Sequence, residues 1–176
     1  MKYIIYSLNK VMKKSQLYLL LGTNLGDREK NIRTALEKLD KAFGGRRLRM
    51  SEVIETEACG FDGPAFLNAV VVYETARLPE TILAICKRIE RSMGRRDAPE
   101  YDSAGSRVYH DRIIDIDILL YGDLRLHSPA LTIPHPQVEG RPFVGRLLSE
   151  VRCQKNSSHR AGVLVFCLAV RLRSGR

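Results

Sequence analysis

Strand-like and helix-like hydrophobic patterns follow one another along this chain, and their order restricts the fold more than any other feature of the sequence. Apolar runs or two-residue alternation indicate strands, and apolar residues at three- and four-residue spacing indicate amphipathic helices. In chain order the segments cover residues 16–22, 27–44, 48–57, 66–74, 79–94 and 112–121. The order strand–helix–strand–strand–helix–strand predicts an α+β fold of the ferredoxin-like βαββαβ type, with a mainly antiparallel sheet.

Both predicted helices carry recognisable end signals. Asp27 is a favourable N-cap, and Gly44 followed by Gly45 is expected to stop the first helix. Pro79 suits the first turn of the second helix, and Gly94 suits its C-terminal end. The side chains expected to face the core are Ile32, Ala35, Leu36, Leu39 and Phe43 in the first helix, and Ile82, Leu83, Cys86, Ile89 and Met93 in the second.

A length of 176 residues fits a single domain with added ends. We expect an N-terminal extension over 1–15, a folded domain over 16–151 and an atypical basic tail over 152–176. Residues 95–106 are polar and without periodicity, which predicts a mobile loop. Four prolines between residues 126 and 143 predict an ordered loop, and a short helix is expected to follow to about Glu150, so the fold should have a C-terminal loop and helix extension.

The net charge of +9 belongs to the two ends of the chain. Residues 1–15 hold four Lys and no acid, and residues 152–176 hold five Arg, one Lys and no acid. Between them remain 19 basic and 20 acidic residues, so the predicted domain is close to neutral. A nucleic-acid-binding domain carries its basic excess on the folded body. We therefore expect no nucleic acid partner. A monomer is expected as well.

Hydropathy and cysteine content favour a cytoplasmic protein. No apolar run approaches the roughly 20 residues that a membrane-spanning helix needs, and residues 3–6 are too short an apolar run for a secretory signal. The four cysteines form neither a CxxC pair nor a zinc-like spacing. Their low number makes a disulfide framework unexpected, which fits a reducing compartment.

The strongest local signal for chemistry is the pair Asp115 and Asp117. In a strand, residues two apart share a face, so Ile114, Ile116 and Ile118 are expected to face the core and both carboxylates the opposite side. Two adjacent carboxylates repel each other, and a shared Mg²⁺ bound to phosphates would stabilise them. A solvated strand face is the alternative interpretation of this pattern.

Several cationic residues lie in or beside the predicted loops, where they could meet phosphates. They are Arg95, Arg112, His135 and Arg141. The guanidinium group matches phosphate oxygens with two parallel donors, so together with the aspartate pair these residues favour a metal–nucleotide site. The sequence contains no G-x-x-x-x-G-K-[ST], which excludes a P-loop enzyme, and no G-x-G-x-x-G, which argues against a Rossmann or protein-kinase site. Residues 22–26 form a tight turn that could also face an anion.

A set of spaced motifs resembles 6-hydroxymethyl-7,8-dihydropterin pyrophosphokinase of folate biosynthesis. The motifs are LGTNLGD at 21–27, FLNAV at 66–70, RIERSMGR at 88–95, DRIIDIDIL at 111–119, IPHP at 133–136 and RPF at 141–143. The resemblance runs from about Gln16 to Glu150. It implies transfer of the terminal diphosphate of ATP to the hydroxymethyl group of the pterin, with AMP as the second product.

The same resemblance implies roles for the charged residues. Asp115 and Asp117 would hold two Mg²⁺ ions brought with ATP, and Arg112 would contact the transferring phosphates. Arg95 would belong to a mobile loop on the nucleotide side. The implied catalytic set is thus Arg95, Arg112, Asp115 and Asp117, and the implied ATP-binding set is Arg95, Arg112, His135 and Arg141.

On the pterin side the resemblance implies ring recognition by an amide and two aromatic rings. Asn68 would hydrogen-bond the ring, Phe143 would stack on it and Phe66 would line the pocket. The segment Thr56, Glu57, Ala58 and Cys59 would supply mostly backbone contacts. Phe66 stands where family members often have Tyr, so the apolar contact is kept without a phenolic hydroxyl.

Two other functions remain open from the residues alone. A non-catalytic ferredoxin-like binding module has the same order of elements. An unrelated Mg²⁺-dependent nucleotide phosphatase would use the same aspartates and arginines. The family resemblance favours the pyrophosphokinase over both.

Overall fold

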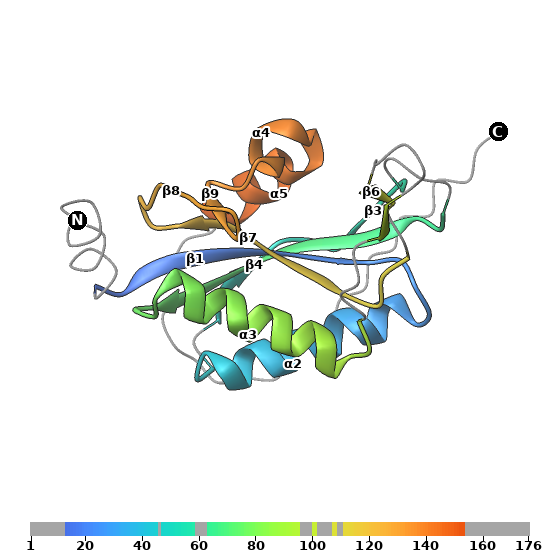
Figure 1. Cartoon of the computed structure of the whole chain (residues 1–176), viewed down its shortest axis with the longest axis horizontal. Helices are drawn as coiled ribbons and strands as arrows, with labels where there is room; N and C mark the ends of the chain where they lie inside the picture. The colour runs from blue at the N-terminus through green and yellow to red at the C-terminus, as the bar shows by residue number, and fades with distance from the viewer. Residues whose placement is uncertain are drawn as a thin grey trace.

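An antiparallel sheet with strand order β2–β4–β1–β7 forms the centre of the molecule (Figure 1). β3 also pairs with β4. The computed structural model describes residues 13–45, 47–58, 63–95 and 111–153, with the backbone of 100–101 and 107–108. The strands are β1 (Ser15–Thr23), β2 (Arg47–Met50), β3 (Ile54–Thr56), β4 (Phe66–Thr75) and β7 (Asp115–Tyr121). Helices and an antiparallel sheet are thus combined as the sequence predicts.

Two helices, α2 (Arg28–Ala42) and α3 (Pro79–Ser92), cover one face of this sheet (Figure 1). The Asp27 side chain accepts a hydrogen bond from the Lys30 amide at 2.9 Å, which confirms the predicted N-cap. After α2 the chain turns through Gly44 and Gly45, both with positive φ, a conformation that glycine adopts without steric cost.

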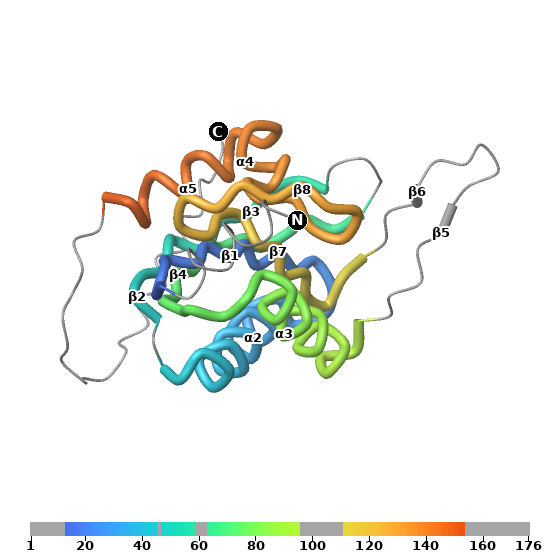
Figure 2. The backbone as a smooth tube through the Cα atoms, turned by 60° about the vertical axis from the view of Figure 1, so that its left-hand side comes forward, coloured from blue at the N-terminus to red at the C-terminus, as the bar shows by residue number. Residues whose placement is uncertain are grey.

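The opposite face is covered by the C-terminal part of the described chain. It contains a short hairpin, β8 (Leu126–His127) and β9 (Thr132–Ile133), followed by α4 (Gln137–Gly140) and α5 (Pro142–Cys153). In Figures 1 and 2 these elements lie on the side of the sheet away from α2 and α3. The sheet is therefore buried on both faces.

The alternation of side chains along the strands divides the core into two layers. The layer under α2 and α3 contains the predicted helix residues together with Leu17, Leu19, Leu21, Ile114, Ile116 and Ile118. The layer under α5 contains Leu20, Val70, Val72, Leu119, Val144, Leu147, Leu148 and Val151. Apolar contacts in the second layer end part of the way along the strands, and polar residues follow on the same face.

The predicted strand over 48–57 is divided in the structure into β2 and β3. Between them the Ser51 amide donates to the Val70 carbonyl at 2.9 Å, and the Ser51 hydroxyl accepts from the Val70 amide at 2.9 Å. A side chain thus takes the place of a backbone acceptor and interrupts the regular ladder.

Two other predicted segments also differ in detail. The segment over 126–143, predicted as a loop, contains the β8–β9 hairpin and α4, and the predicted short helix is α5, which continues to Cys153. Most of the predicted mobile loop over 95–106 lies outside the described residues. Within it, the backbone of Glu100–Tyr101 (β5) pairs with Arg107–Val108 (β6). None of the helices in the described part of the chain is long and apolar enough to cross a bilayer.

Candidate active site

The two aspartates of β7 lie on the face of the sheet that α4 and α5 approach. Ile114, Ile116 and Ile118 are buried in the layer under α2 and α3, with exposed fractions of 2% or less. Because side chains alternate along a strand, Asp115 and Asp117 face the other side. The predicted orientation of the pair is thus confirmed.

The strand register brings a second polar side chain towards this pair. On β1, Gly22 lies opposite Asp115 of β7 and, on its other side, opposite Asn68 of β4. Leu20, two residues earlier, lies opposite Asp117. Since Gly22 has no side chain, a gap opens between the carboxylates of β7 and the amide of β4.

This gap lies at the bottom of a pocket of about 110 Å³. Strand residues form the floor, and the segment from α4 to the start of α5 contributes a wall. The lining residues are Leu20, Gly22, Thr56, Glu57, Phe66, Asn68, Arg112, Asp115, Asp117, Gln137 and Arg141. The pocket thus brings together eight of the residues singled out from the sequence, from four separate parts of the chain.

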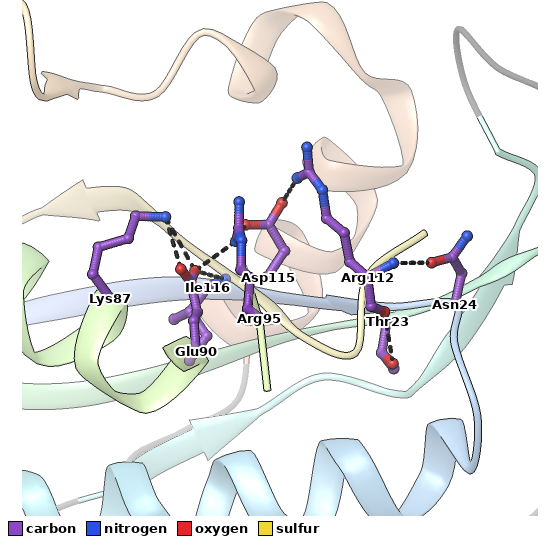
Figure 3. A network of polar contacts seen from close by, with 8 residues as sticks. All are labelled: Thr23, Asn24, Lys87, Glu90, Arg95, Arg112, Asp115 and Ile116. Atoms are coloured by element: carbon purple, nitrogen blue, oxygen red, sulfur yellow. Dashed lines mark hydrogen bonds and ion pairs between the residues drawn. The ribbon is translucent and has the colours of Figure 1, made fainter. Parts of the chain in front are cut away.

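Asp115 lies between two arginines, as Figure 3 shows. Arg95, just beyond α3, pairs with one carboxylate oxygen, and Arg112 pairs with the other. Burial alone would raise the pKa of Asp115, but the two guanidinium groups outweigh it and hold the pKa below its ordinary value. Asp115 is therefore a stable anion.

Asp117 has the opposite electrostatic surroundings. In the described part of the chain its carboxylate forms no ion pair or hydrogen bond. Burial, followed by the negative charge of Asp115, raises the pKa of Asp117 to about 7. An additional cation at the pocket would stabilise the charged form of Asp117. The negative charge of Asp115 is already balanced by the two arginines.

A buried glutamate from α3 supports this arrangement from below. The Glu90 side chain is completely buried, and its carboxylate accepts from Lys87 Nζ at 2.9 Å and pairs with Arg95 at 3.0 Å (Figure 3). It also accepts from the backbone amide of Ile116 at 2.8 Å. Burial raises the pKa of Glu90, although both cations favour its charged form. Glu90 thus links α3 and Arg95 to the strand residue between the two aspartates.

The other side of the pocket is built around Asn68. Its amide nitrogen donates to the Thr56 hydroxyl at 2.9 Å, which links β4 to β3. A Cβ atom added at Gly22 would lie 3.2 Å from Asn68 Oδ1 and 3.8 Å from a ring carbon of Phe66. The absence of a side chain at Gly22 therefore keeps room in front of the amide and the ring.

Two of the residues predicted to lie on the ATP side come from the segment around α4. Arg141 lines the pocket. The backbone amide of His135 donates to the Leu119 carbonyl at 2.9 Å, which attaches this segment to β7. Burial lowers the pKa of His135, the charge of Asp115 raises it and that of Arg141 lowers it, with a net decrease. His135 is thus close enough to Asp115 for the carboxylate charge to affect its pKa.

Three residues predicted to lie on the pterin side are not among the described residues that line the pocket. Phe143 is partly buried against the apolar layer under α5 and is not among the described residues that line the pocket. Ala58 is half-buried and directly follows Glu57 of the pocket rim. Cys59 lies outside the described residues.

Three polar residues of the site were not predicted from the sequence. Glu90 occupies a helix position four residues after the buried Cys86, and an acid on an apolar stripe is the signal that could have identified it. Gln137 lines the pocket, and its buried side-chain oxygen has no hydrogen-bond partner in the described part of the chain. Asn24 belongs to the 22–26 turn, and its side chain contacts the backbone at Arg112.

The chemical composition of the pocket suits a divalent cation that also contacts a phosphate. Within the described residues no group of three acidic, histidine or cysteine side chains is placed to hold a metal ion, so a metal bound by those residues would need further ligands. Both oxygens of Asp115 contact arginines, so metal ligation by Asp115 would be easier if one guanidinium exchanged the carboxylate for another anion. A phosphate is an acceptor of the right geometry for that exchange.

An α+β fold and a pocket of paired carboxylates facing arginines together define a protein suited to metal-assisted phosphoryl transfer. Comparison with protein families makes this specific. Residues 18–153 match the family model described as 7,8-dihydro-6-hydroxymethylpterin-pyrophosphokinase. The chain belongs to this family.

Curated relatives agree with the family model. A protein of Porphyromonas gingivalis named 2-amino-4-hydroxy-6-hydroxymethyldihydropteridine pyrophosphokinase is 46% identical over 137 residues, covering 77% of this chain and 89% of that protein. A protein of Aquifex aeolicus with the same name is 37% identical over 136 residues, covering 77% and 79%. A crystal structure of Plasmodium falciparum HPPK-DHPS with pteroate has a TM-score of 0.55 at 15% identity, covering 86% of this chain and 40% of that one, which indicates a shared fold.

Proposed function

We propose that this chain transfers diphosphate from ATP to 6-hydroxymethyl-7,8-dihydropterin and releases AMP, the reaction named for its 46% and 37% identical relatives. The observation that carries the proposal is a pair of aspartates with oppositely shifted pKa values, Asp115 and Asp117, beside two arginines at one end of the pocket. The amide of Asn68 and the ring of Phe66 form the other end. A non-catalytic module has no need of such a pair, and a phosphatase has no need of the amide–ring end.

The metal would be held by Asp117 and Asp115, with the phosphates and water completing the shell. Mg²⁺ is usually bound by one or two carboxylates together with substrate phosphates, and Asp115 and Asp117 both line this pocket. Family resemblance suggests two ions. When bound, the metal would neutralise phosphate charge and acidify the attacking hydroxyl.

The residues of this chain would act mainly by orientation and charge. In the reaction the hydroxymethyl oxygen forms a bond to the β-phosphorus, and the bond from that phosphorus to the oxygen bridging to the α-phosphate breaks. Arg95 and Arg112 would move from Asp115 to the phosphate oxygens, and Arg141 and His135 would contact ATP from the α4 side. Such positioning alone can contribute about 7–11 kcal/mol to lowering a barrier.

Asn68 would fix the pterin by hydrogen bonds to the ring edge. Its Nδ2 is used by Thr56, so Oδ1 remains to accept from a ring N–H or the amino group. Phe66 would contact a ring face, and Phe143 would do so after its side chain leaves the apolar layer under α5. Residues Thr56 to Cys59 would add backbone contacts.

One assay separates the proposal from its alternatives. We expect AMP to form from ATP only when the hydroxymethyl pterin and Mg²⁺ are both present. Nucleotide hydrolysis without pterin would indicate a phosphatase, and absence of turnover with unimpaired pterin binding would indicate a binding module.

We expect Mg²⁺ to bind far more tightly with ATP than without it, because the described residues contain no group of three acidic, histidine or cysteine side chains that could hold a metal ion. Asp117 must also lose its proton, so metal binding should strengthen as the pH rises through about 7. Calorimetric titration of Mg²⁺ at pH 6 and pH 8, with and without a non-hydrolysable ATP analogue, measures both effects. Tight metal binding by the free protein at pH 6 would contradict this prediction.

Gly22→Ala is expected to weaken pterin binding roughly tenfold, about 1.4 kcal/mol. A Cβ there lies 3.2 Å from Asn68 Oδ1, and Asn68 cannot simply retreat because Thr56 holds it. Binding of the ATP analogue with Mg²⁺ should change little. Gly145→Ala on α5 is the control, since a Cβ there meets nothing within 4 Å. Equal pterin affinities in the two variants would refute the effect.

We further infer that the core is of the ferredoxin-like βαββαβ type, with β8, β9, α4 and α5 as a C-terminal extension. The strand order β2–β4–β1–β7 supports this. The proposed domain over 16–151 agrees closely with the family match over 18–153, and α5 extends to Cys153. A monomer in the cytoplasm, without nucleic acid or membrane partners, is proposed from composition and cysteine content.

A further inference from the structure

Asn24 lies in the turn between β1 and α2 and is almost completely buried, with 3% of its surface exposed. Its side chain contacts two segments that are far apart in the sequence. Oδ1 accepts from the Arg112 amide at 2.7 Å, and Nδ2 donates to the Pro64 carbonyl at 3.2 Å and to Asp111 Oδ1 at 2.7 Å. Its backbone amide also donates to the Arg112 carbonyl at 3.0 Å. Figure 3 shows Asn24 beside Arg112, on the far side of Asp115 from Glu90.

The two segments that meet at Asn24 belong to the two ends of the pocket. Pro64 stands two residues before Phe66, at the entrance to β4 on the side of Asn68. Arg112 carries one of the two guanidinium groups that hold Asp115 on the side of the aspartate pair. Asn24 itself is not among the described residues that line the pocket. It can therefore act on bound substrates only through its neighbours.

The contacts require an amide at this position. A backbone N–H can only donate and the Pro64 carbonyl can only accept, so the acceptor and donor ends of Asn24 are fixed by its partners. Aspartate would keep the bond to Arg112 but would present an acceptor to Pro64. An apolar residue of the same size would leave a buried N–H and a carbonyl without this partner.

We propose that Asn24 is a positioning residue that couples the pterin end of the pocket to the phosphate end. A pterin that orders the segment entering β4 fixes Pro64, and through Asn24 it fixes the backbone of Arg112. ATP binding then has less of the backbone around Arg112 left to order, so its affinity rises. Bound ATP raises the affinity for pterin by the same factor, because coupling between sites is reciprocal. The assignment of the two ends rests on the function proposed above.

The coupling is measured as the change in affinity for one ligand caused by the other. Calorimetric titration with a non-hydrolysable ATP analogue and Mg²⁺, with and without saturating hydroxymethyl pterin, gives the coupling factor for the full chain. For the unaltered chain we expect at least about fivefold tighter binding of the analogue with pterin. In Asn24→Ala the factor should fall towards one, with each ligand alone binding within a few-fold of normal.

A double variant tests the Pro64 contact separately from the Arg112 contact. Asn24→Asp combined with Asp111→Asn keeps an acceptor for the Arg112 amide and a donor–acceptor pair with position 111, and it removes only the donor to Pro64. Coupling should be lost here too, with the intrinsic affinity for the ATP analogue retained. Because the bond to Arg112 survives, this variant stays informative if Asn24→Ala does not fold.

Asn31→Ala is the matched control. Asn31 stabilises the same turn by donating to Thr23 Oγ1 at 3.2 Å and to the Leu25 carbonyl at 2.8 Å, and it bonds directly to neither Pro64 nor Arg112. Its link to Arg112 runs through Thr23 Oγ1, which donates to the Arg112 carbonyl over the longer distance of 3.4 Å. It should lower the thermal midpoint and leave the coupling factor unchanged. Full coupling in the double variant, equal loss in Asn31→Ala, or no coupling in the unaltered chain would overturn the proposal. Failure of AMP formation would instead contradict the proposed function, since coupling is measured without turnover.

Discussion

Asp115→Asn and Asp117→Asn are each expected to lower diphosphate transfer by a factor of about 10² or more, while shifting the stability of the metal-free protein in opposite directions at pH 8. Both variants lose a carboxylate proposed to hold Mg²⁺, and a small displacement of reacting groups can cost about 10²-fold in rate. The stability difference follows from the contrasting surroundings of the two side chains.

The pKa of Asp117 is raised from 3.8 to about 7, so the folded protein keeps a proton that the unfolded chain releases. Its stability therefore falls as the pH rises from about 4 to about 7, and at pH 8 the charged carboxylate is destabilising. Asparagine resembles the protonated form. The thermal midpoint of Asp117→Asn at pH 8 should rise, by roughly 2–4 °C for each kcal/mol gained.

The pKa of Asp115 is lowered instead, so its charge stabilises the fold above its ordinary pKa and this contribution is lost on acidification. Asp115→Asn removes the carboxylate that pairs with Arg112 and Arg95, while the Arg95–Glu90 pair remains. We expect a loss of about 3 kcal/mol at pH 8, as for other broken buried ion pairs. Thermal unfolding of the three proteins at pH 5 and pH 8 checks both signs, and midpoints that move together at pH 8 would contradict the assignment.

Glu90→Gln is expected to reduce turnover by about 10² while leaving pterin affinity nearly unchanged. Glutamine keeps an acceptor for the Ile116 amide but loses the charge that holds Arg95 and Lys87. Arg95 would then lose one of the two buried carboxylates that pair with it, and the other, Asp115, is proposed to bind the metal. The loss of a charge-assisted pair with a fully buried carboxylate should also destabilise the fold by about 1.5–3 kcal/mol.

A purely structural role for Glu90 would lower stability without altering kinetics of the folded fraction. Turnover and pterin KM, measured well below the midpoint of each protein, separate the two roles. Lys87→Met serves as the control, because Lys87 contacts the same carboxylate but is one-third exposed and is not proposed to touch phosphate. Normal turnover in folded Glu90→Gln would show that Arg95 does not need this support.

The parts of the fold that depend on local patterns could be predicted from the sequence. The N-cap at Asp27 is confirmed, and the predicted alternation over residues 114–118 places three isoleucines in the core and two aspartates in the pocket. These features depend on residues within a few positions of one another, for which periodicity and capping rules hold.

The parts that depend on contacts distant in the sequence could not. The Asn24 side chain accepts a hydrogen bond from the Arg112 amide, which lies 88 residues further along the chain. The Ser51 hydroxyl accepts from the Val70 amide, 19 residues further along, in place of a backbone carbonyl. Nothing within residues 22–26 or 48–57 signals these partners. Glu90 is intermediate: its place beside a buried stripe was visible in the sequence, but its cluster with Arg95 and the Ile116 amide required the packing of α3 on β7.

The most direct test of the proposed function is to identify the bond of ATP that breaks. Phosphorus NMR of the reaction with ATP, Mg²⁺ and hydroxymethyl dihydropterin should show AMP and a pterin diphosphate ester appearing in equal amounts, and no ADP. The same signals should be absent when pterin is omitted. Accumulation of ADP, with either inorganic phosphate or a pterin monophosphate, would mean attack at the γ-phosphorus and would contradict the proposed diphosphate transfer.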